Sequence, residues 1–288
     1  MEYLIHIVIL SSIFAILAMS LNLLLGYTGL LSVAHAAFYG IGAYTTALML
    51  KMWGLSFFVA LPLAIILTMI IAFVIGLILS KFKTDYYALA SLGFNVIVFS
   101  IFLNWNTLTR GPLGISGIPR PEIFGFALSN NILFLGLVLA LLAIVYGLAQ
   151  FIVHSSFGRV LTAIREDEEA ISVFGYNTSS YKLIIFTIAA GIAAVAGALI
   201  ATYITFIDPS SFTIVESIFV LAIVIFGGAG SLRGPLFGAI ILVLLPELLR
   251  FVGFPSDIAA QMRQVVYGLI LVGLMLYRPQ GIWGTYRL

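Results

Sequence analysis

The sequence contains no cysteine and few charged residues. Without cysteine the 288-residue chain can form no disulfide bond, no thiolate nucleophile and no zinc site built on cysteine. Only 8% of its residues are charged, whereas soluble domains carry about 25%. The formal net charge of +2 is too small for the basic surface that a nucleic-acid-binding protein needs. These shortages argue against a soluble domain and against a nucleic-acid partner.

Patterns for catalysis and nucleotide binding are also missing. None of the lysines follows a glycine, so the chain has no G-x-x-x-x-G-K-[ST] loop to hold the phosphates of ATP. His6, His35 and His154 are isolated and lack the spacing of metal ligands. Serine pairs occur without a nearby histidine and acid that could activate a nucleophile. We therefore expect no catalytic residue, no metal and no cofactor in this chain.

Apolar residues are abundant and fall into long runs. They make up 62% of the chain, and the mean hydropathy is +1.21. A helix needs about 20 mostly apolar residues to cross the hydrocarbon core of a bilayer. Nine candidate spans meet or approach that length: 3–25, 34–50, 55–79, 86–103, 131–152, 183–206, 212–226, 235–252 and 262–277. The pattern predicts an all-α polytopic membrane protein of about eight to ten helices, forming one domain over residues 1–288.

Three of these spans are short, which suggests tilted, broken or re-entrant segments: 34–50, 212–226 and 262–277. Two glycine-rich stretches, 26–44 and 226–240, each follow one span and open another. Transporters often break helices at corresponding positions of two repeats, so the stretches suggest an internal repeat. The glycines at 40, 42, 191 and 197 instead favour close contact between helices.

The distribution of lysine and arginine predicts the orientation. If 154–182 lies in the cytoplasm and the spans alternate, eight basic residues fall inside and five outside. This places the N-terminus outside and the C-terminus in the cytoplasm, although one re-entrant segment would change the result. The loop 104–130 then lies outside, and its length indicates that it folds over the outer mouth.

The segment "GRVLTAIREDEEAISVFGYN", residues 158–177, is exceptional because it concentrates charge. Six charged residues fall within twelve positions: Arg159, Arg165, Glu166, Asp167, Glu168 and Glu169. We predict a short helix over 167–175, capped by Asp167 and ended by Gly175 in the left-handed conformation. Its apolar surface would consist of Ala170, Ile171, Val173 and Phe174. Such a segment is either a solvated loop or a helix that docks into a partner's groove.

Four polar residues within or beside the apolar spans are candidates for a translocation pathway: Asn22, His35, Asn95 and Glu216. The two asparagines can equally serve as hydrogen-bonding partners between helices. For His35, a role in capping a helix competes with a role in the pathway. Glu216 follows "DPSSFT" by one turn, so it stays hydrated if its span begins at the outer surface; otherwise it could bind an ammonium group or hold a gate.

The charged segment resembles the cytoplasmic segment of ABC importer permeases. Glu169, Ala170 and Gly175 stand at the spacing of the EAA motif of these proteins, although Ile171 replaces the second alanine and the later proline is absent. Further stretches resemble the branched-chain amino acid permease family over nearly the whole chain: "GYTGLLSVAHAAFYGIGAY", "DYYALASLGFNVIV", "LTRGPLGISGIP", "FIDPSSFT", "GGAGSLRGP", "LLPELLR" and "YRPQGIWG".

The resemblance implies an import system in a prokaryotic cell membrane with several subunits. A homologous second permease, two cytoplasmic ATPases that bind ATP, and an extracytoplasmic substrate-binding protein would be its partners. Segment 154–182 would then contain the coupling helix, with contacts to the ATPases from Arg159, Arg165, Glu166, Asp167, Glu169, Ala170, Phe174 and Gly175. The expected substrates are leucine, isoleucine and valine. The alternatives are other amino acids, amides or urea, or a different class: an ion-coupled secondary transporter, an intramembrane enzyme or a scaffold.

Overall fold

The protein is a bundle of helices in the computed structural model, which describes residues 2–82, 84–123, 126–128, 130–251, 265, 268–269, 272–273 and 281–284. Five helices within these residues are long and apolar enough to cross a membrane: α1 (Glu2–Thr28), α3 (Phe57–Leu79), α4 (Thr84–Asn104), α6 (Asn131–His154) and α9 (Thr178–Ile204). Three shorter helices complete the bundle: α2 (His35–Met52), α10 (Ile214–Gly227) and α11 (Gly234–Phe251). The predicted fold class is confirmed, while the candidate span 262–277 lies largely outside the described residues.

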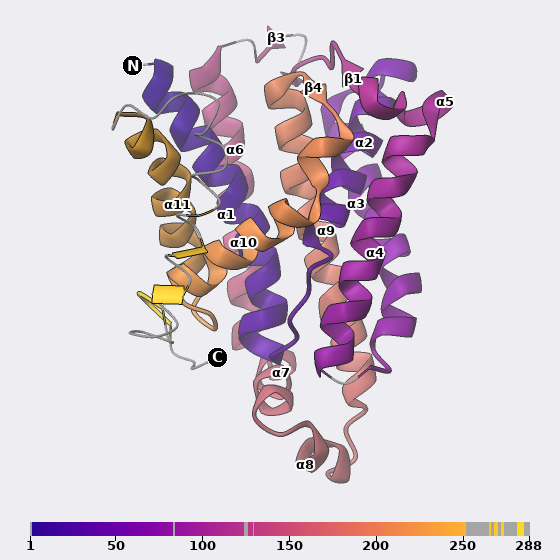
Figure 1. Ribbon diagram of the computed structural model, residues 1–288, viewed down its shortest axis with the longest axis vertical. Coiled ribbons are helices and arrows are strands. Elements are labelled where there is room, and N and C mark those ends of the chain that lie inside the picture. The colour runs from indigo at the N-terminus through magenta and orange to yellow at the C-terminus, as the bar shows by residue number, and fades with distance from the viewer. Residues whose placement is uncertain are drawn as a thin grey trace.

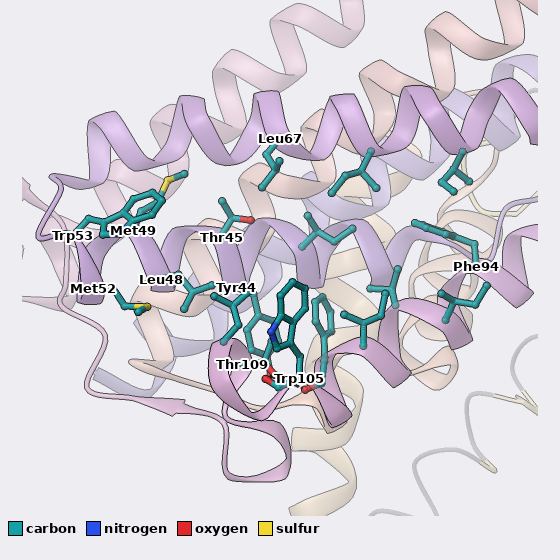
Figure 2. A pocket seen from close by; sticks show the side chains of 18 residues that line it. Tyr44, Thr45, Leu48, Met49, Met52, Trp53, Leu67, Phe94, Trp105 and Thr109 are labelled. Atoms are coloured by element: carbon teal, nitrogen blue, oxygen red, sulfur yellow. Dashed lines mark hydrogen bonds between the residues drawn. The ribbon is translucent and has the colours of Figure 1, made fainter.

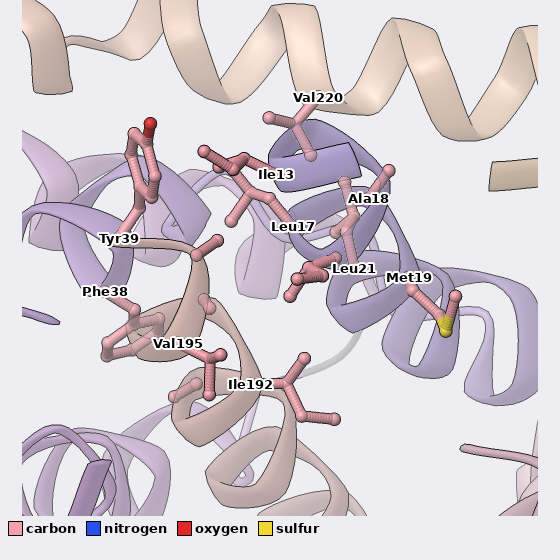
Figure 3. Packing of buried hydrophobic residues seen from close by; sticks show 14 of the residues in the cluster. Ile13, Leu17, Ala18, Met19, Leu21, Phe38, Tyr39, Ile192, Val195 and Val220 are labelled. Carbon is pink, nitrogen blue, oxygen red and sulfur yellow. The ribbon is translucent and has the colours of Figure 1, made fainter. Parts of the chain in front are cut away.

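Helices α1 and α9 form the centre of the bundle. Helix α1 contacts α6, α9, α10 and α11, and most of its side chains are buried. Figure 3 shows Leu17 and Leu21 of α1 facing Ile192 and Val195 of α9, with Val220 of α10 beside α1. Helices α3 and α6 lie farther out and keep many apolar side chains exposed. Lipid is as apolar as leucine, so this exposure is expected of a membrane protein.

Glycine allows α2 to cross α9 at close range. A Cβ on Gly42 would lie 2.5 Å from the Cα of Ala194, and a Cβ on Gly197 would lie 2.1 Å from the carbonyl oxygen of Tyr39. Neither position leaves room for a side chain. The prediction that these glycines serve helix contact is confirmed.

Two of the shorter helices, α2 and α10, begin halfway along the bundle rather than at one of its ends. Residues 29–34 climb from the end of α1 back to mid-height, where α2 starts (Figure 1). Residues 205–213 return in the same way from the opposite end of α9 to the start of α10. One unit consists of α1, residues 29–34 and α2, and the other consists of α9, residues 205–213 and α10. Because α1 and α9 run in opposite directions, these two units have inverted orientations (Figure 1). The glycine-rich stretches 26–44 and 226–240 are therefore not the matching pieces of this repeat.

The two ends of the bundle differ. The N-terminal end of α1 lies at one end, and α7 (Ser156–Glu166) and α8 (Glu168–Val173) lie at the other (Figure 1). The predicted outer loop 104–130 folds at the end opposite α8. It contains five short elements: α5 (Asn106–Thr109), η1 (Gly111–Leu113), β1 (Ile115–Ser116), β2 (Glu122–Ile123) and β3 (Phe126–Ala127). Strand β4 (Phe206–Ile207) and the turn η2 (Pro209–Phe212) follow α9. Strand β1 pairs with β4, and β2 pairs with β3, so two small strand pairs add to the predicted helices.

Candidate functional site

The charged segment forms two short helices that project from the bundle. The predicted helix over 167–175 is present as α8, and the Asp167 carboxylate caps it by accepting a hydrogen bond from the backbone N–H of Ala170 at 2.9 Å. Gly175 ends the helix with a φ of 89°, in the left-handed region. Both local predictions are confirmed. Helix α7 was not predicted as a separate element.

The apolar surface of α8 points away from the rest of the molecule. Val173 is 86% exposed and Phe174 is 78% exposed. Helix α8 itself projects beyond the end of the bundle (Figure 1). Ala170 and Ile171 are half-buried on the same short helix. Two large apolar side chains in adjacent positions therefore stand free of any described neighbour that would cover them.

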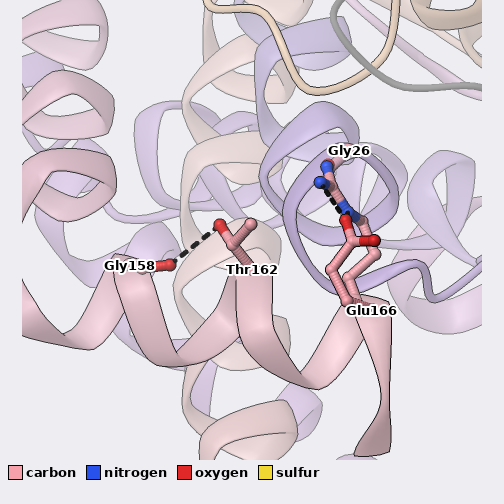
Figure 4. A network of polar contacts seen from close by, with 5 residues as sticks. Gly26, Gly158, Thr162 and Glu166 are labelled. Atoms are coloured by element: carbon pink, nitrogen blue, oxygen red, sulfur yellow. Dashed lines mark hydrogen bonds and ion pairs between the residues drawn. The ribbon is translucent and has the colours of Figure 1, made fainter.

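One hydrogen bond to α1 and one ion pair to α9 attach this segment to the two central helices. Arg165 donates a hydrogen bond from Nη1 to the carbonyl oxygen of Gly26 in α1 at 2.6 Å, and it pairs with Glu166 at 2.7 Å (Figure 4). Glu168 contacts the ammonium of Lys182, a buried residue in the second turn of α9. Arg159 lies exposed on α7. The roles of Arg165 and Glu168 as anchors were not predicted, because their partners lie in other parts of the chain.

A polar cluster joins the starts of α2 and α10 in the middle of the bundle. The hydroxyl of Ser217 accepts hydrogen bonds from the backbone N–H of Ala36 at 3.0 Å and from the Asn95 amide at 2.9 Å. The same Asn95 amide donates to the carbonyl of Val33, also at 2.9 Å. His35 is fully buried beside the backbone of Ser20, and neither ring nitrogen makes a hydrogen bond with a described residue.

The structure thus brings together two of the four candidate pathway residues, His35 and Asn95. It adds Ser217, and also Ser91, whose hydroxyl accepts a hydrogen bond from the backbone N–H of Val33 at 2.9 Å. Sequence reasoning missed both serines, because a single serine in an apolar helix commonly bonds only its own backbone.

Glu216 lies in the first turn of α10, next to the cluster, and is partly exposed. Its carboxylate makes no hydrogen bond or ion pair with any residue that the structure describes. Because residues 205–213 first run inward, α10 begins at mid-height and not at the outer surface. The condition under which Glu216 would remain hydrated at that surface is therefore not met.

Asn22, the remaining candidate, lies elsewhere, near the α8 end of α1. Its side-chain amide accepts a hydrogen bond from the backbone N–H of Gly230 at 3.0 Å and donates one to the carbonyl of Ser231 at 2.9 Å. These two residues belong to the turn between α10 and α11. Asn22 therefore links α1 to that turn and is separate from the central cluster.

An apolar groove of about 650 Å³ opens between α2, α3 and α4 (Figure 2). Tyr44, Thr45 and Thr109 are the hydroxyl-bearing residues of its lining, and no charged residue lines it. Unpaired charges are expensive to bury in such surroundings. The groove therefore does not suit the charged ends of a free amino acid.

Comparison with known proteins agrees with this architecture. Residues 3–275 match the model of a family described as the permease component of branched-chain amino acid transport systems. The chain belongs to this family. Its sequence is 36% identical to the high-affinity branched-chain amino acid transport permease LivM of Salmonella typhimurium, over 96% of this chain and 69% of that protein. No solved structure matches the chain.

More distant relatives include both kinds of permease named in such systems. A probable LivM of Methanocaldococcus jannaschii is 29% identical over 77% of this chain and 68% of its own length. The permease LivH of Salmonella typhimurium is 26% identical over 96% of this chain and 93% of its own length. The resemblance seen in the sequence is confirmed, and the chain is a multi-pass membrane permease.

Proposed function

We propose that this chain is one of two permease subunits of an importer for branched-chain amino acids, and that separate ATPases drive it. Family membership supports the transport role and a related second permease. The feature of the structure that most supports the energy source is α8, which has an exposed apolar tip. An ion pair joins α8 to α9, and a hydrogen bond from Arg165 joins the preceding α7 to α1. A helix with this chemistry fits a groove on a partner.

Docking through α8 also accounts for the charge in this segment. Asp167 and Glu169 lie in or next to the first turn of α8, where the helix dipole favours negative charge. Val173 and Phe174 would enter the ATPase surface, and Gly175 would allow the chain to turn back toward α9. Among the residues predicted to couple transport to ATP hydrolysis, Asp167 and Gly175 would shape α8, and Arg165 would hold the segment against α1.

The translocation pathway is proposed to run along the face of α10 that carries Glu216. Ionisable residues within a membrane almost always face the protein interior or a water-filled cavity. Glu216 is partly exposed on the isolated chain, so this face of α10 is expected to meet the second permease or the pathway rather than lipid. The carboxylate would receive the ammonium group of the substrate, with His35 and Asn95 behind it.

Reconstitution tests the function. Proteoliposomes that contain this chain, a second permease, the ATPases and a substrate-binding protein should take up labelled leucine only when ATP is supplied to the ATPases. Uptake by this chain alone under an ion gradient would instead establish a secondary transporter. Calorimetry on the binding protein with leucine, isoleucine, valine, amides and urea would identify the substrate class.

The variant Glu216→Gln tests the pathway in the same system. It keeps the size of the side chain and removes the charge, and a hydrogen bond to a charged group contributes about 1.5–3 kcal/mol. We expect uptake to fall about tenfold or more, with normal assembly of the complex. Glu2→Gln removes an exposed carboxylate at the far end of α1 and serves as the control. Equal uptake by both variants would contradict the assignment.

A further inference from the structure

The last turn of α1 is capped by a side chain from the coupling segment. Arg165 is only 10% exposed, and its Nη1 reaches the carbonyl oxygen of Gly26, two residues before α1 ends. The last carbonyls of a helix lack partners within the helix and favour a nearby cation. Gly29 follows with a φ of 70°, and a Cβ there would lie 3.1 Å from the Cγ of Arg165. Movement of α7 must therefore act directly on this end of α1.

The same stretch of α1 is bonded on another side to the turn that follows α10. Asn22 lies one turn before Gly26 and is fully buried, and both ends of its amide bond the backbone of Gly230 and Ser231. A Cβ on Gly26 would lie 2.3 Å from the amide nitrogen of Gly230, so the two backbones are in direct contact. The end of α1 is thus clamped between α7 and the turn at 228–233.

Helix α10 extends from this turn to the middle of the bundle (Figure 1). Its 14 residues span about 20 Å, and Ser217 in its first turn bonds both Asn95 and the start of α2. Protein interiors are close-packed, so a helix held at both ends transmits a displacement instead of absorbing it. A continuous series of bonded elements therefore connects α7 with the central polar cluster.

We infer that the end of α1 is a mechanical relay, in which Arg165 and Asn22 are positioning residues that pass movement of α7 and α8 to α10. This inference rests on the proposed function, because it assumes that an ATPase moves α8. It assigns Asn22 to the transmission of movement instead of to contact with the substrate. The relay would shift the face of α10 that carries Glu216 whenever the coupling segment moves.

The test measures amino acid transported per ATP hydrolysed in the complete reconstituted complex. Arg165→Met and Asn22→Ala should each lower this ratio about fivefold or more, which is the low end of typical coupling between distant sites. The double variant should lose no more than the worse single variant, because both act on one series of contacts. Lys81→Met removes an exposed cation from the same end of the bundle and should leave the ratio unchanged.

Equal losses of transport and ATP hydrolysis, which leave the ratio unchanged, would show a merely structural role and overturn the relay. Losses that multiply in the double variant would also overturn it. If Arg165→Met does not assemble, Arg165→Lys retains a cation and is compared with Asn22→Ala instead. A wild-type complex that fails to transport would refute the proposed function, whereas only variants of a transporting complex bear on the relay.

Discussion

Replacing Phe174 with alanine tests whether α8 is the site where an ATPase docks. The side chain is 78% exposed, so removing it costs the isolated chain little packing. Its backbone N–H bonds the carbonyl of Ala170 at 3.3 Å, and alanine keeps that bond. Full burial of an aromatic side chain in a partner's groove contributes about 2 kcal/mol or more. The dissociation constant between permease and ATPase should therefore rise about 30-fold.

The assay is the binding of purified ATPase to the permease complex in nanodiscs, measured by surface plasmon resonance. Leu113→Ala is the matched control, because Leu113 is 82% exposed but lies in the loop at the opposite end of the bundle. We expect the control to bind the ATPase as the wild type does. Unchanged affinity for Phe174→Ala would refute the docking of α8, because no apolar contact would then have been lost.

Two further predictions concern packing and anchoring. Gly197→Ala should lower the free energy of unfolding by about 1–3 kcal/mol, because the added methyl group overpacks α2 against α9. Gly136→Ala is the control and should not lower it, because nothing lies within 4 Å of a Cβ there. Thermal unfolding in detergent measures both variants, and equal stabilities would contradict the close crossing of α2 and α9. Lys182→Met should remove the ion pair of Glu168, leave it only the hydrogen bond from the Thr178 hydroxyl at 3.0 Å, and make α8 more mobile. A nitroxide on Val173→Cys reports this by electron paramagnetic resonance, since the chain has no native cysteine, and an unchanged spectrum would count against the anchor.

Local features were predictable from the sequence, and features that join distant segments were not. The helix capped by Asp167 and ended by Gly175 was predictable because a cap and a left-handed glycine act within one turn. The long spans followed from hydropathy alone. Hydropathy does not show how deep in the membrane a helix begins. Only the short length of the corresponding spans suggested that α2 and α10 begin at mid-height. Arg165 and Gly26 are 139 residues apart, and nothing local to either residue predicts their hydrogen bond.

The position of α1 at the centre of the bundle has a consequence for biogenesis. It is the first of the described helices to leave the ribosome, yet the helices that enclose it are made later. The side chain of Asn22 cannot form its hydrogen bond with Gly230 at first, because Gly230 is synthesised 208 residues later. Until then its amide must rest against lipid, water or a temporary companion in the insertion machinery. The final hydrogen bonds of Asn22, and with them the native packing of this end of α1, can therefore form only after the turn beyond α10 has been synthesised.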